Sequence, residues 1–459
     1  MSMKVMLINP PPVDGIRYSR EGRCQEKESV LGAVKPPLTL LYIASLAREA
    51  GHEIVLVDAN TKRLDAKKTS ALVLAYSPDV IFITTSTSTV DADFDCLPPG
   101  YGGAVFVIGA IAKSIPGYVF AKHPAIKGIV IGDPEAATED ILKGNLASPG
   151  GVLIREGGRM KAVQQKSETD IDNIPIPAWD LVDFKDYLLP NNGKPYAIVE
   201  ISRGCPHNCN FCVTGLVHGK RIRSKNPERL IREVSAIKER YCIMDFYFLA
   251  DSPFSDKKQI RLILEALISA RLGIKWMSNA RLDTIDEDIG RLLASSGCWM
   301  LAVGIESGSD MVRDAMDKKM ASSDIKKGLS ILKKNGIKTL GFFIFGAWGE
   351  TKETISDTMR LSLQLDVTFA NFYPAIPYPG TAFYALCKKG GFLTSSDLSR
   401  YDYSDFVIDY RNGVDRAFVL SKKKEAYLRF YLRPAKLMEL AASMNPISIA
   451  RCGIGVLGD

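Results

Sequence analysis

The chain has 459 residues, of which 46% are hydrophobic and 24% are charged, and its formal net charge is +7. This composition is ordinary for a soluble globular protein of two or three domains, and so modest a charge gives no case for nucleic-acid binding. The opening apolar run is too short for a secretory signal or a membrane span. The nine cysteines are odd in number and mostly scattered, which favours a reducing cytoplasm over a disulfide framework.

Residues 1–144 predict a doubly wound, Rossmann-like α/β domain. Apolar runs and helical patterns alternate here, as is typical of a parallel sheet covered on both faces. Strands are expected within residues 4–9, 52–60, 79–89 and 104–110, a helix over residues 36–51, and a fifth strand followed by a last helix within residues 128–142. Ligands of such sheets bind at the carboxyl ends of the strands. No GxGxxG follows the first strand, so a nicotinamide site is unsupported.

Two stretches interrupt this regular alternation. Residues 89–104 contain two prolines and three glycines, so at most a short turn of helix is expected there. Residues 145–195 are rich in glycine, proline and charge, and predict a linker. Trp179 and Tyr187 are its expected anchors across the domain boundary.

Residues 196–385 repeat a strand followed by a helix six times. The strands are expected within residues 196–201, 245–251, 275–283, 299–307, 339–351 and 368–381, and the first helix, residues 227–241, begins with proline. The second helix is expected to be capped by Ser255. Residues 386–459 predict a mainly helical extension that restarts at Pro434. Its basic and aromatic residues could meet a membrane surface, but a packed helix with a solvated basic face is favoured.

Three cysteines follow the first of these strands, with three and then two residues between them: Cys205, Cys209 and Cys212. Thiolates this close can bind one metal centre, and their softness favours zinc, copper(I) or an iron–sulfur cluster. Three protein ligands leave one position open for chemistry. Phe211, just before the third cysteine, can shield such a centre. The alternatives are a zinc loop or three unrelated buried thiols.

This CxxxCxxC loop after a strand resembles that of the radical S-adenosylmethionine (SAM) superfamily. The resemblance implies a partial (β/α)6 barrel and a [4Fe–4S] cluster on the three cysteines, with SAM on the fourth iron. It also implies cleavage of SAM to a 5′-deoxyadenosyl radical that abstracts hydrogen from an unactivated carbon. The other cysteines should be dispensable for the cluster: Cys24, Cys96, Cys242, Cys298, Cys387 and Cys452.

The same resemblance implies that SAM lies against Phe211 and the carboxyl ends of the barrel strands. The implied contacts are Ala250, Asp251 and Ser252 for the amino group, Asn279 and Arg281 for the carboxylate or the substrate, Glu306 and Ser307 for the ribose, and Phe343 and Phe345 for adenine. For Glu306 the alternative is a salt bridge to Arg281 or Lys338, and both interpretations stay open.

The N-terminal domain resembles the cobalamin-binding domain that precedes the barrel in one large subgroup. NPPP after the first strand, the Ser/Thr-rich end of the third strand, GDPEAA and the later PYPGT carry this resemblance. The implied cobalamin contacts are Asn9, Pro10, Pro11, Pro12, Thr84, Thr85, Ser86, Thr87, Ser88, Gly109, Ala110, Gly132 and Asp133. The Asp-x-His-x-x-Gly ligand motif of mutases is absent, and neither His52 nor His123 is expected to bind cobalt. The alternative is a flavodoxin-like domain that has lost its cofactor.

Together these features predict a cytoplasmic, cobalamin-dependent radical SAM enzyme that methylates an unactivated carbon of a small-molecule, lipid or pigment substrate. The cofactors would carry the chemistry, and a reducing partner such as flavodoxin or ferredoxin would supply electrons. The enzymatic alternative is cyclisation, ring contraction or carbon–carbon coupling without net methylation. The alternative from another class is a zinc-binding scaffold.

Overall fold

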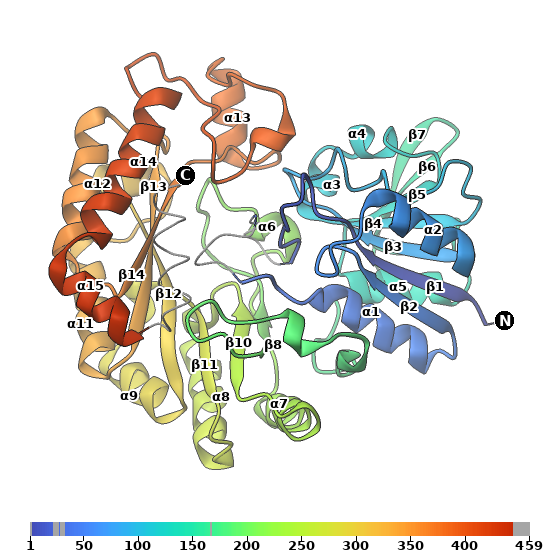
Figure 1. The fold of residues 1–459 in the computed structure, drawn as a ribbon, viewed down its shortest axis with the longest axis horizontal. Coiled ribbons are helices and arrows are strands. Elements are labelled where there is room, and N and C mark those ends of the chain that lie inside the picture. The colour runs from blue at the N-terminus through green and yellow to red at the C-terminus, as the bar shows by residue number, and fades with distance from the viewer. Residues whose placement is uncertain (1, 22–26, 28–32, 166–167, 444–459) are drawn as a thin grey trace. The chain divides into compact units, whose positions relative to one another are not determined.

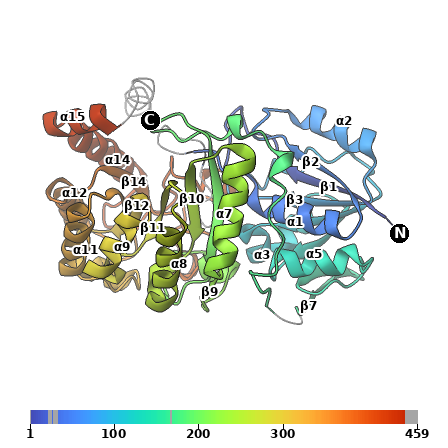
Figure 2. The same ribbon diagram turned by 90° about the horizontal axis from the view of Figure 1, so that it is seen from below.

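The computed structural model describes residues 2–21, 27, 33–165 and 168–443. The chain forms two compact units (Figures 1 and 2). The first unit comprises the described residues before position 28, Val34–Tyr187 and Leu216–His218. The second comprises Ala33, Leu188–Gly215 and the described residues from Gly219 onward. Within the described ranges, none of the helices combines the length and hydropathy that crossing a membrane would need.

The first unit is built on a seven-stranded sheet with the order β2-β1-β3-β4-β5-β6-β7. Its first five strands are parallel: β1 Lys4–Asn9, β2 Glu53–Asp58, β3 Val80–Thr84, β4 Ala104–Ile108 and β5 Ile126–Val130. The helices are α1 Leu38–Glu49, α2 Ala66–Tyr76, α3 Ala110–Ser114, α4 Pro116–Phe120 and α5 Pro134–Leu142. The predicted doubly wound domain is confirmed. Residues 85–103 form turns and no helix, as the prolines and glycines predicted.

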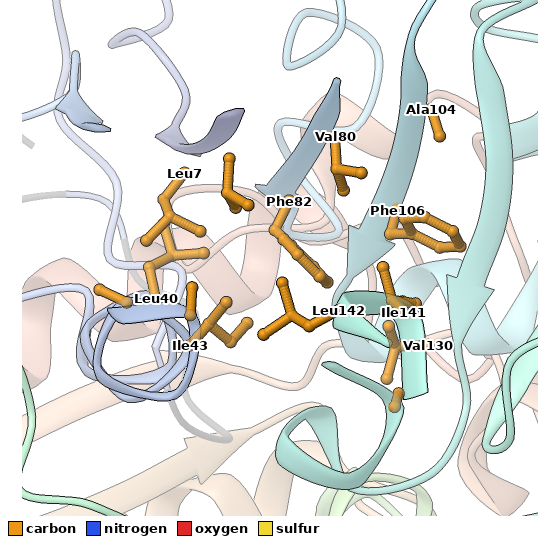
Figure 3. Packing of buried hydrophobic residues seen from close by; sticks show 14 of the residues in the cluster. Leu7, Leu40, Ile43, Val80, Phe82, Ala104, Phe106, Val130, Ile141 and Leu142 are labelled. Atoms are coloured by element: carbon orange, nitrogen blue, oxygen red, sulfur yellow. The ribbon is translucent and has the colours of Figure 1, made fainter. Parts of the chain in front are cut away.

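One face of this sheet packs against α1 and α5 (Figure 3). Phe82 and Phe106 of neighbouring strands, with ring centroids 5.9 Å apart, lie in a buried cluster with Leu40 and Ile43 of α1 and Ile141 of α5. Adjacent residues in these strands are buried as well, so both faces of the sheet are covered. This explains why the strands are continuous apolar runs rather than alternating ones.

The sheet extends into the segment that we expected to be a linker. Strands β6 Val152–Glu156 and β7 Arg159–Val163 form an antiparallel hairpin on the edge of β5. Beyond it, the indole of Trp179 is buried and stacks on Phe184, and the Tyr187 hydroxyl donates to Asp58 in β2. Both predicted anchors therefore make these contacts within the first unit. The strongly charged β7 sequence concealed the hairpin, because an exposed edge strand buries little apolar surface.

The second unit contains six parallel strands, in agreement with a partial (β/α)6 barrel. They are β8 Tyr196–Arg203, β10 Asp245–Ala250, β11 Lys275–Ala280, β12 Cys298–Glu306, β13 Lys338–Phe345 and β14 Phe369–Pro374, and the short β9 Arg223–Ser224 pairs antiparallel with β8. The helices are α7 Pro227–Tyr241, α8 Lys257–Ala270, α9 Glu287–Ser295, α10 Asp310–Ala315, α11 Ser322–Lys334, α12 Lys352–Gln364, α13 Ala382–Lys389, α14 Arg416–Tyr431 and α15 Pro434–Ser443. The short α6 Thr214–Val217 is divided between the two units.

Two details of this unit differ from expectation. The cap of α8 is Asp256, whose side chain accepts from the Gln259 N–H, and not Ser255. The expected C-terminal extension also supplies the sixth barrel helix, since α14 packs against β14. Between β14 and α14 the chain forms α13 and several loops. The strand and its helix are therefore far apart in the sequence, and their packing was not predicted.

Alternate side chains of the barrel strands have different environments. Phe343 and Phe345 pack on Phe372, which contacts Phe430 of α14, so this set faces the helices and is fully buried. The opposite set points into the barrel and keeps partial exposure: Tyr247, Met277, Met300, Phe342, Ile344 and Tyr373. The barrel interior is therefore not a closed apolar core.

Candidate active site

The cysteine loop leaves β8 through a narrow neck. Gly204 has a φ of +91°, and a Cβ atom there would lie 2.0 Å from the carbonyl oxygen of Arg221. Only glycine fits both the backbone angle and this close approach. The Cys205 N–H then donates to the Gly219 carbonyl at 3.2 Å. The two ends of the loop are thus joined directly before the first cysteine.

Asn210 fastens the middle of the loop to other elements. Its N–H donates to the Met316 carbonyl at 3.0 Å, its side-chain amide donates to the Ala315 carbonyl at 2.8 Å, and its carbonyl accepts from the Phe383 N–H at 2.9 Å. The neighbouring Phe211 packs on Met316 and nearby apolar residues. Sequence reasoning missed Asn210, because a buried asparagine is recognised only from its partners.

The three cysteines are partly exposed and unbridged. The Cys212 thiol donates to the Thr214 hydroxyl at 3.2 Å. Burial raises the pKa of the Cys209 thiol, while the Lys318 ammonium and the Arg281 guanidinium oppose that shift. In the described part of the chain no group of three or more His, Cys, Asp or Glu side chains is placed to hold one metal ion. Three reduced thiols on one tethered loop are nevertheless a donor set that suits an iron–sulfur cluster.

At the end of β10 the structure separates the three residues expected near the SAM amino group. Ala250 is buried, and the Ser252 hydroxyl is buried beside that of Ser255 at 2.8 Å. Asp251 is partly exposed and accepts from the Gly204 N–H at 2.9 Å. Of these three residues, Asp251 is the one that hydrogen-bonds to the start of the cysteine loop.

At the end of β11, Arg281 lies beside the cysteine loop. Its guanidinium forms two hydrogen bonds with Asp283, at 3.1 and 2.7 Å, and its Nη1 is 3.9 Å from the Cys209 sulfur. The Asn279 side chain donates to the Tyr247 hydroxyl at 2.8 Å inside the barrel. Arg281 is therefore placed next to the cluster ligands, and Asn279 lies deeper in the barrel.

Glu306, at the end of β12, forms a buried ion pair with Lys318 at 2.7 Å. The open choice of Arg281 or Lys338 as its salt-bridge partner is thus corrected to Lys318. A Cβ atom on Gly304 would lie 2.2 Å from Glu306 Oε1 and 2.7 Å from Lys318 Nζ, so glycine is required there for the pair to form. Ser307 is fully buried with its hydroxyl 3.2 Å from that of Thr358.

The two phenylalanines expected at adenine do not face the barrel. Phe343 and Phe345 are both 0% exposed and lie on the helix side of β13. Because side chains alternate along a strand, the neighbouring Phe342 and Ile344 are the inward residues. The sequence shows the apolar run but not which alternate residues of the strand face the barrel interior.

The predicted cobalamin residues lie at the carboxyl ends of the first sheet, but their hydroxyl groups point inward. Thr85 and Thr89 each donate to Asp93 at 2.7 Å, and Asp93 also pairs with the buried Arg20. The Thr85 hydroxyl, which we expected to line the cobalamin site, is therefore already hydrogen-bonded to Asp93. Thr84, Thr85, Ser86, Thr87 and Ser88 are all buried, as are Asn9, Pro10, Pro11, Ala110 and Asp133.

The partly exposed members of the set are Pro12, Gly109 and Gly132, one each at the ends of β1, β4 and β5. The Thr84 hydroxyl is buried and has no hydrogen-bond partner. In the order β2-β1-β3-β4, the chain adds β2 on one side of β1 and β3 on the other, so the strand order reverses between β1 and β3 although both strands are parallel. Ligands of such sheets bind at this switch point. Arg20, which pairs with Asp93, also donates to the carbonyls of Pro10 and Pro11 and so holds the backbone that follows β1.

His52 and His123, the two histidines of residues 1–144, do not lie at these strand ends. His52 precedes β2, where its Nδ1 accepts from the Met3 N–H at 3.0 Å. His123 precedes β5, where its Nδ1 accepts from the Ala125 N–H at 3.1 Å. Both are at the amino ends of strands, which agrees with the expectation that neither ligates cobalt.

Residues 199–362 match the family described as the radical SAM superfamily. The match runs from within β8 to within α12 and includes all three cysteines of the loop. Residues 199–362 therefore form a radical SAM domain.

Curated relatives are similar to most of the chain, beyond the radical SAM domain. An uncharacterized methyltransferase of Pyrococcus horikoshii is 29% identical over 99% of this chain and 98% of its own length. An anaerobic magnesium-protoporphyrin IX monomethyl ester cyclase of Rubrivivax gelatinosus is 24% identical, covering 88% of this chain and 75% of the relative. A bacteriochlorophyllide d C-12(1)-methyltransferase of Chlorobaculum tepidum is 24% identical, covering 82% and 79%.

Two solved structures share the fold over the whole chain. TsrM of Kitasatospora setae, a radical SAM methyltransferase with cobalamin and a [4Fe–4S] cluster bound, gives a TM-score of 0.68 at 16% identity and covers 100% of this chain and 96% of TsrM. The cobalamin-dependent radical enzyme OxsB gives 0.73 at 14% identity, covering 99% and 72%. The two-domain fold class inferred from the sequence is therefore confirmed.

Proposed function

We propose that this radical SAM enzyme binds cobalamin on its first unit and methylates an unactivated carbon of a flat, mainly apolar small molecule. The observation that carries the proposal is the presence, in one chain, of the CxxxCxxC loop after β8 and a parallel sheet with the order β2-β1-β3-β4-β5. The Pyrococcus horikoshii methyltransferase, alike over its full length, supports methyl transfer.

The protein's own residues would hold and orient the cofactors. When bound, the [4Fe–4S] cluster supplies reductive cleavage of SAM, and cobalamin supplies the transferable methyl group. Cys205, Cys209 and Cys212 would ligate the cluster. Arg281 binds Asp283 through its Nε and Nη2, and its Nη1, 3.9 Å from the Cys209 sulfur, would face the SAM carboxylate. The net charge of +7 suits an acidic electron donor such as flavodoxin or ferredoxin.

The barrel interior supports a flat apolar substrate. The ring centroids of Phe342 and Tyr373 are 5.8 Å apart, and those of Tyr373 and Tyr403 are 4.1 Å apart. Charged groups at the nearby strand ends are engaged with each other: Glu200 with Arg203, Arg281 with Asp283, and Glu306 with Lys318. Aromatic and methionine surfaces favour planar rings. This favours the pigment-like substrates of the relatives over a cytidylyl phosphonate, on which another relative acts.

The proposal is tested with anaerobically reconstituted protein, hydroxocobalamin, a reductant and SAM deuterated in its methyl group. We expect one of a panel of porphyrins, chlorins and indoles to gain a deuterated methyl group while S-adenosylhomocysteine accumulates. The protein should hold about four irons per chain, and replacing all three loop cysteines with alanine should abolish both iron binding and SAM cleavage. Full iron retention in that variant would contradict the site.

Cyclisation is the second candidate, and the Rubrivivax gelatinosus cyclase favours it because that relative aligns with 88% of this chain. The two reactions differ in their products. A substrate that loses hydrogen and closes a ring, with no deuterium gained and no S-adenosylhomocysteine, would replace methylation with cyclisation. Iron analysis separates both from a zinc scaffold, which would hold zinc and no iron.

A further inference from the structure

The carboxylate of Asp251 contacts both flanks of the cysteine loop. Its Oδ2 accepts from the Gly204 N–H at 2.9 Å, immediately before Cys205. Its Oδ1 lies 3.5 Å from the Thr214 hydroxyl, two residues after Cys212. One side chain at the end of β10 therefore reaches the backbone on one side of the loop and a hydroxyl on the other.

The strand pairing below explains why Asp251 reaches that far. Leu249 pairs with Glu200, but Ala250 pairs with Ser202, so the register between β10 and β8 slips by one residue. Such an irregularity redirects the chain that follows it. Here the slip lies between Leu249 and Ala250, directly before Asp251, whose carboxylate accepts from the Gly204 N–H.

Thr214 carries this contact on to a cluster ligand. It is 2% exposed, and its hydroxyl lies 3.2 Å from the Cys212 sulfur. A metal-bound thiolate has no proton, so in the loaded protein Thr214 becomes the only donor in this contact, toward the sulfur or toward Asp251. A hydrogen bond to a cluster sulfur influences the reduction potential of the cluster.

We propose that Asp251 is a positioning residue for the cluster loop. It holds the Gly204 backbone and the Thr214 hydroxyl, and through them orients Cys205 and Cys212. It is not the group that binds the SAM amino group. The inference depends only on the radical SAM cluster, so it stands or fails separately from cobalamin binding and methyl transfer.

The test compares Asp251→Asn with Asp251→Ala in the full chain after anaerobic reconstitution. Asparagine keeps an oxygen that accepts from the Gly204 N–H, whereas alanine does not. Asp251→Asn should retain full iron, the wild-type electron paramagnetic resonance spectrum of the reduced cluster, and SAM affinity within about threefold. Asp251→Ala should lose iron or show an altered spectrum before SAM is added.

Asp256→Ala is the matched control, because Asp256 caps α8 through the Gln259 N–H. It should lower stability and leave the spectrum of the cluster unchanged. Thr214→Val keeps the side-chain shape and removes the hydroxyl. It should retain iron and change the reduction potential of the cluster from the wild-type value, which can be measured even if Asp251→Ala does not fold.

Two results would overturn the proposal. In the first, both Asp251 variants keep the iron and the spectrum but lose SAM affinity by about tenfold or more, which would make Asp251 a direct SAM ligand. In the second, the reduction potential of Thr214→Val and the spectrum of Asp251→Ala both equal those of the wild type.

Discussion

Glu306 and Lys318 form an ion pair whose side chains are only 8% and 7% exposed. Glu306 also has a φ of +66°, which is uncommon for a residue other than glycine. Such a conformation persists only where its surroundings enforce it, and it often occurs at functional sites. Here the pair with Lys318 and the space left by Gly304 enforce it.

Glu306→Gln should destabilise the protein in the absence of SAM, because it leaves the Lys318 ammonium buried without a carboxylate. Removing one member of a buried pair costs about 3–5 kcal/mol. The double variant with Lys318→Met should recover much of that loss, measured as the thermal midpoint under anaerobic conditions. If the double variant folds well and still binds SAM normally, Glu306 does not hold the ribose.

Glu350 is a second buried carboxyl group, and burial raises its pKa to about 8 against opposing hydrogen bonds from the Gly346 and Ala347 N–H groups. The pKa of Glu350 in the folded protein exceeds the ordinary value of 4.5, so the folded protein binds this proton more tightly than the unfolded chain does. The resulting stabilisation is complete below pH 4.5 and is lost as the pH rises toward 8. The free energy of unfolding should fall across this window by up to about 1.4 kcal/mol per pH unit.

Glu350→Gln should remove this part of the pH dependence, because glutamine cannot titrate. Denaturation midpoints measured across the same pH window test this. The matched control is Glu353→Gln, an exposed residue in the first turn of α12, which should leave the dependence above pH 5 unchanged. Equal slopes for wild type and Glu350→Gln would show that Glu350 is ionised in the folded protein.

At the scale of elements, the outer edge of β14 is protected by α14. The Tyr431 hydroxyl accepts from the Ala370 N–H at 2.9 Å and donates to the Ala370 carbonyl at 2.8 Å, and the Tyr427 hydroxyl accepts from the Phe372 N–H at 3.2 Å. A barrel of six strands does not close, so its edge strand needs such partners. Side chains of α14 thus replace the hydrogen bonds of a next strand.

Tyr431→Phe should cost about 1–3 kcal/mol, because it leaves a buried N–H and a buried carbonyl unsatisfied. Hydrogen exchange at Ala370 should speed up, while exchange in β10 should not. Tyr118→Phe, at a position 43% exposed, serves as the control: it loses a solvent-exposed hydrogen bond to Asp91 and should leave exchange at Ala370 unchanged. Unchanged exchange at Ala370 would show that the phenol is not needed at this edge.

At the scale of the whole molecule, the β6–β7 hairpin moves the end of the first unit beyond the expected residue 144. A fragment of residues 1–187 keeps the hairpin and the buried Trp179. A fragment of residues 1–144 exposes the edge of β5, and an open edge promotes aggregation.

We expect the 1–187 fragment to remain monomeric and to bind hydroxocobalamin with micromolar or tighter affinity. The 1–144 fragment should aggregate or bind more weakly. Equilibrium dialysis and size-exclusion chromatography measure the two properties. A monomeric 1–187 fragment with no affinity for hydroxocobalamin would leave the first unit without a cobalamin site of its own.

The sequence alone determined the parallel strands of both units, the helices α1 and α5, the main helices between the barrel strands and the cysteine triad, because strand and helix periodicity and ligand spacing are local properties. It did not predict α2, α3, α4 or the β6–β7 hairpin. Only the tertiary structure decided that Phe342 rather than Phe343 faces the barrel, that Lys318 pairs with Glu306, and that Thr85 turns to Asp93. Each of these depends on which distant segments meet. When a strand carries apolar residues on both faces, its sequence does not show which alternate residues face the barrel interior. In the same way, a charged residue does not show which opposite charge will be buried beside it.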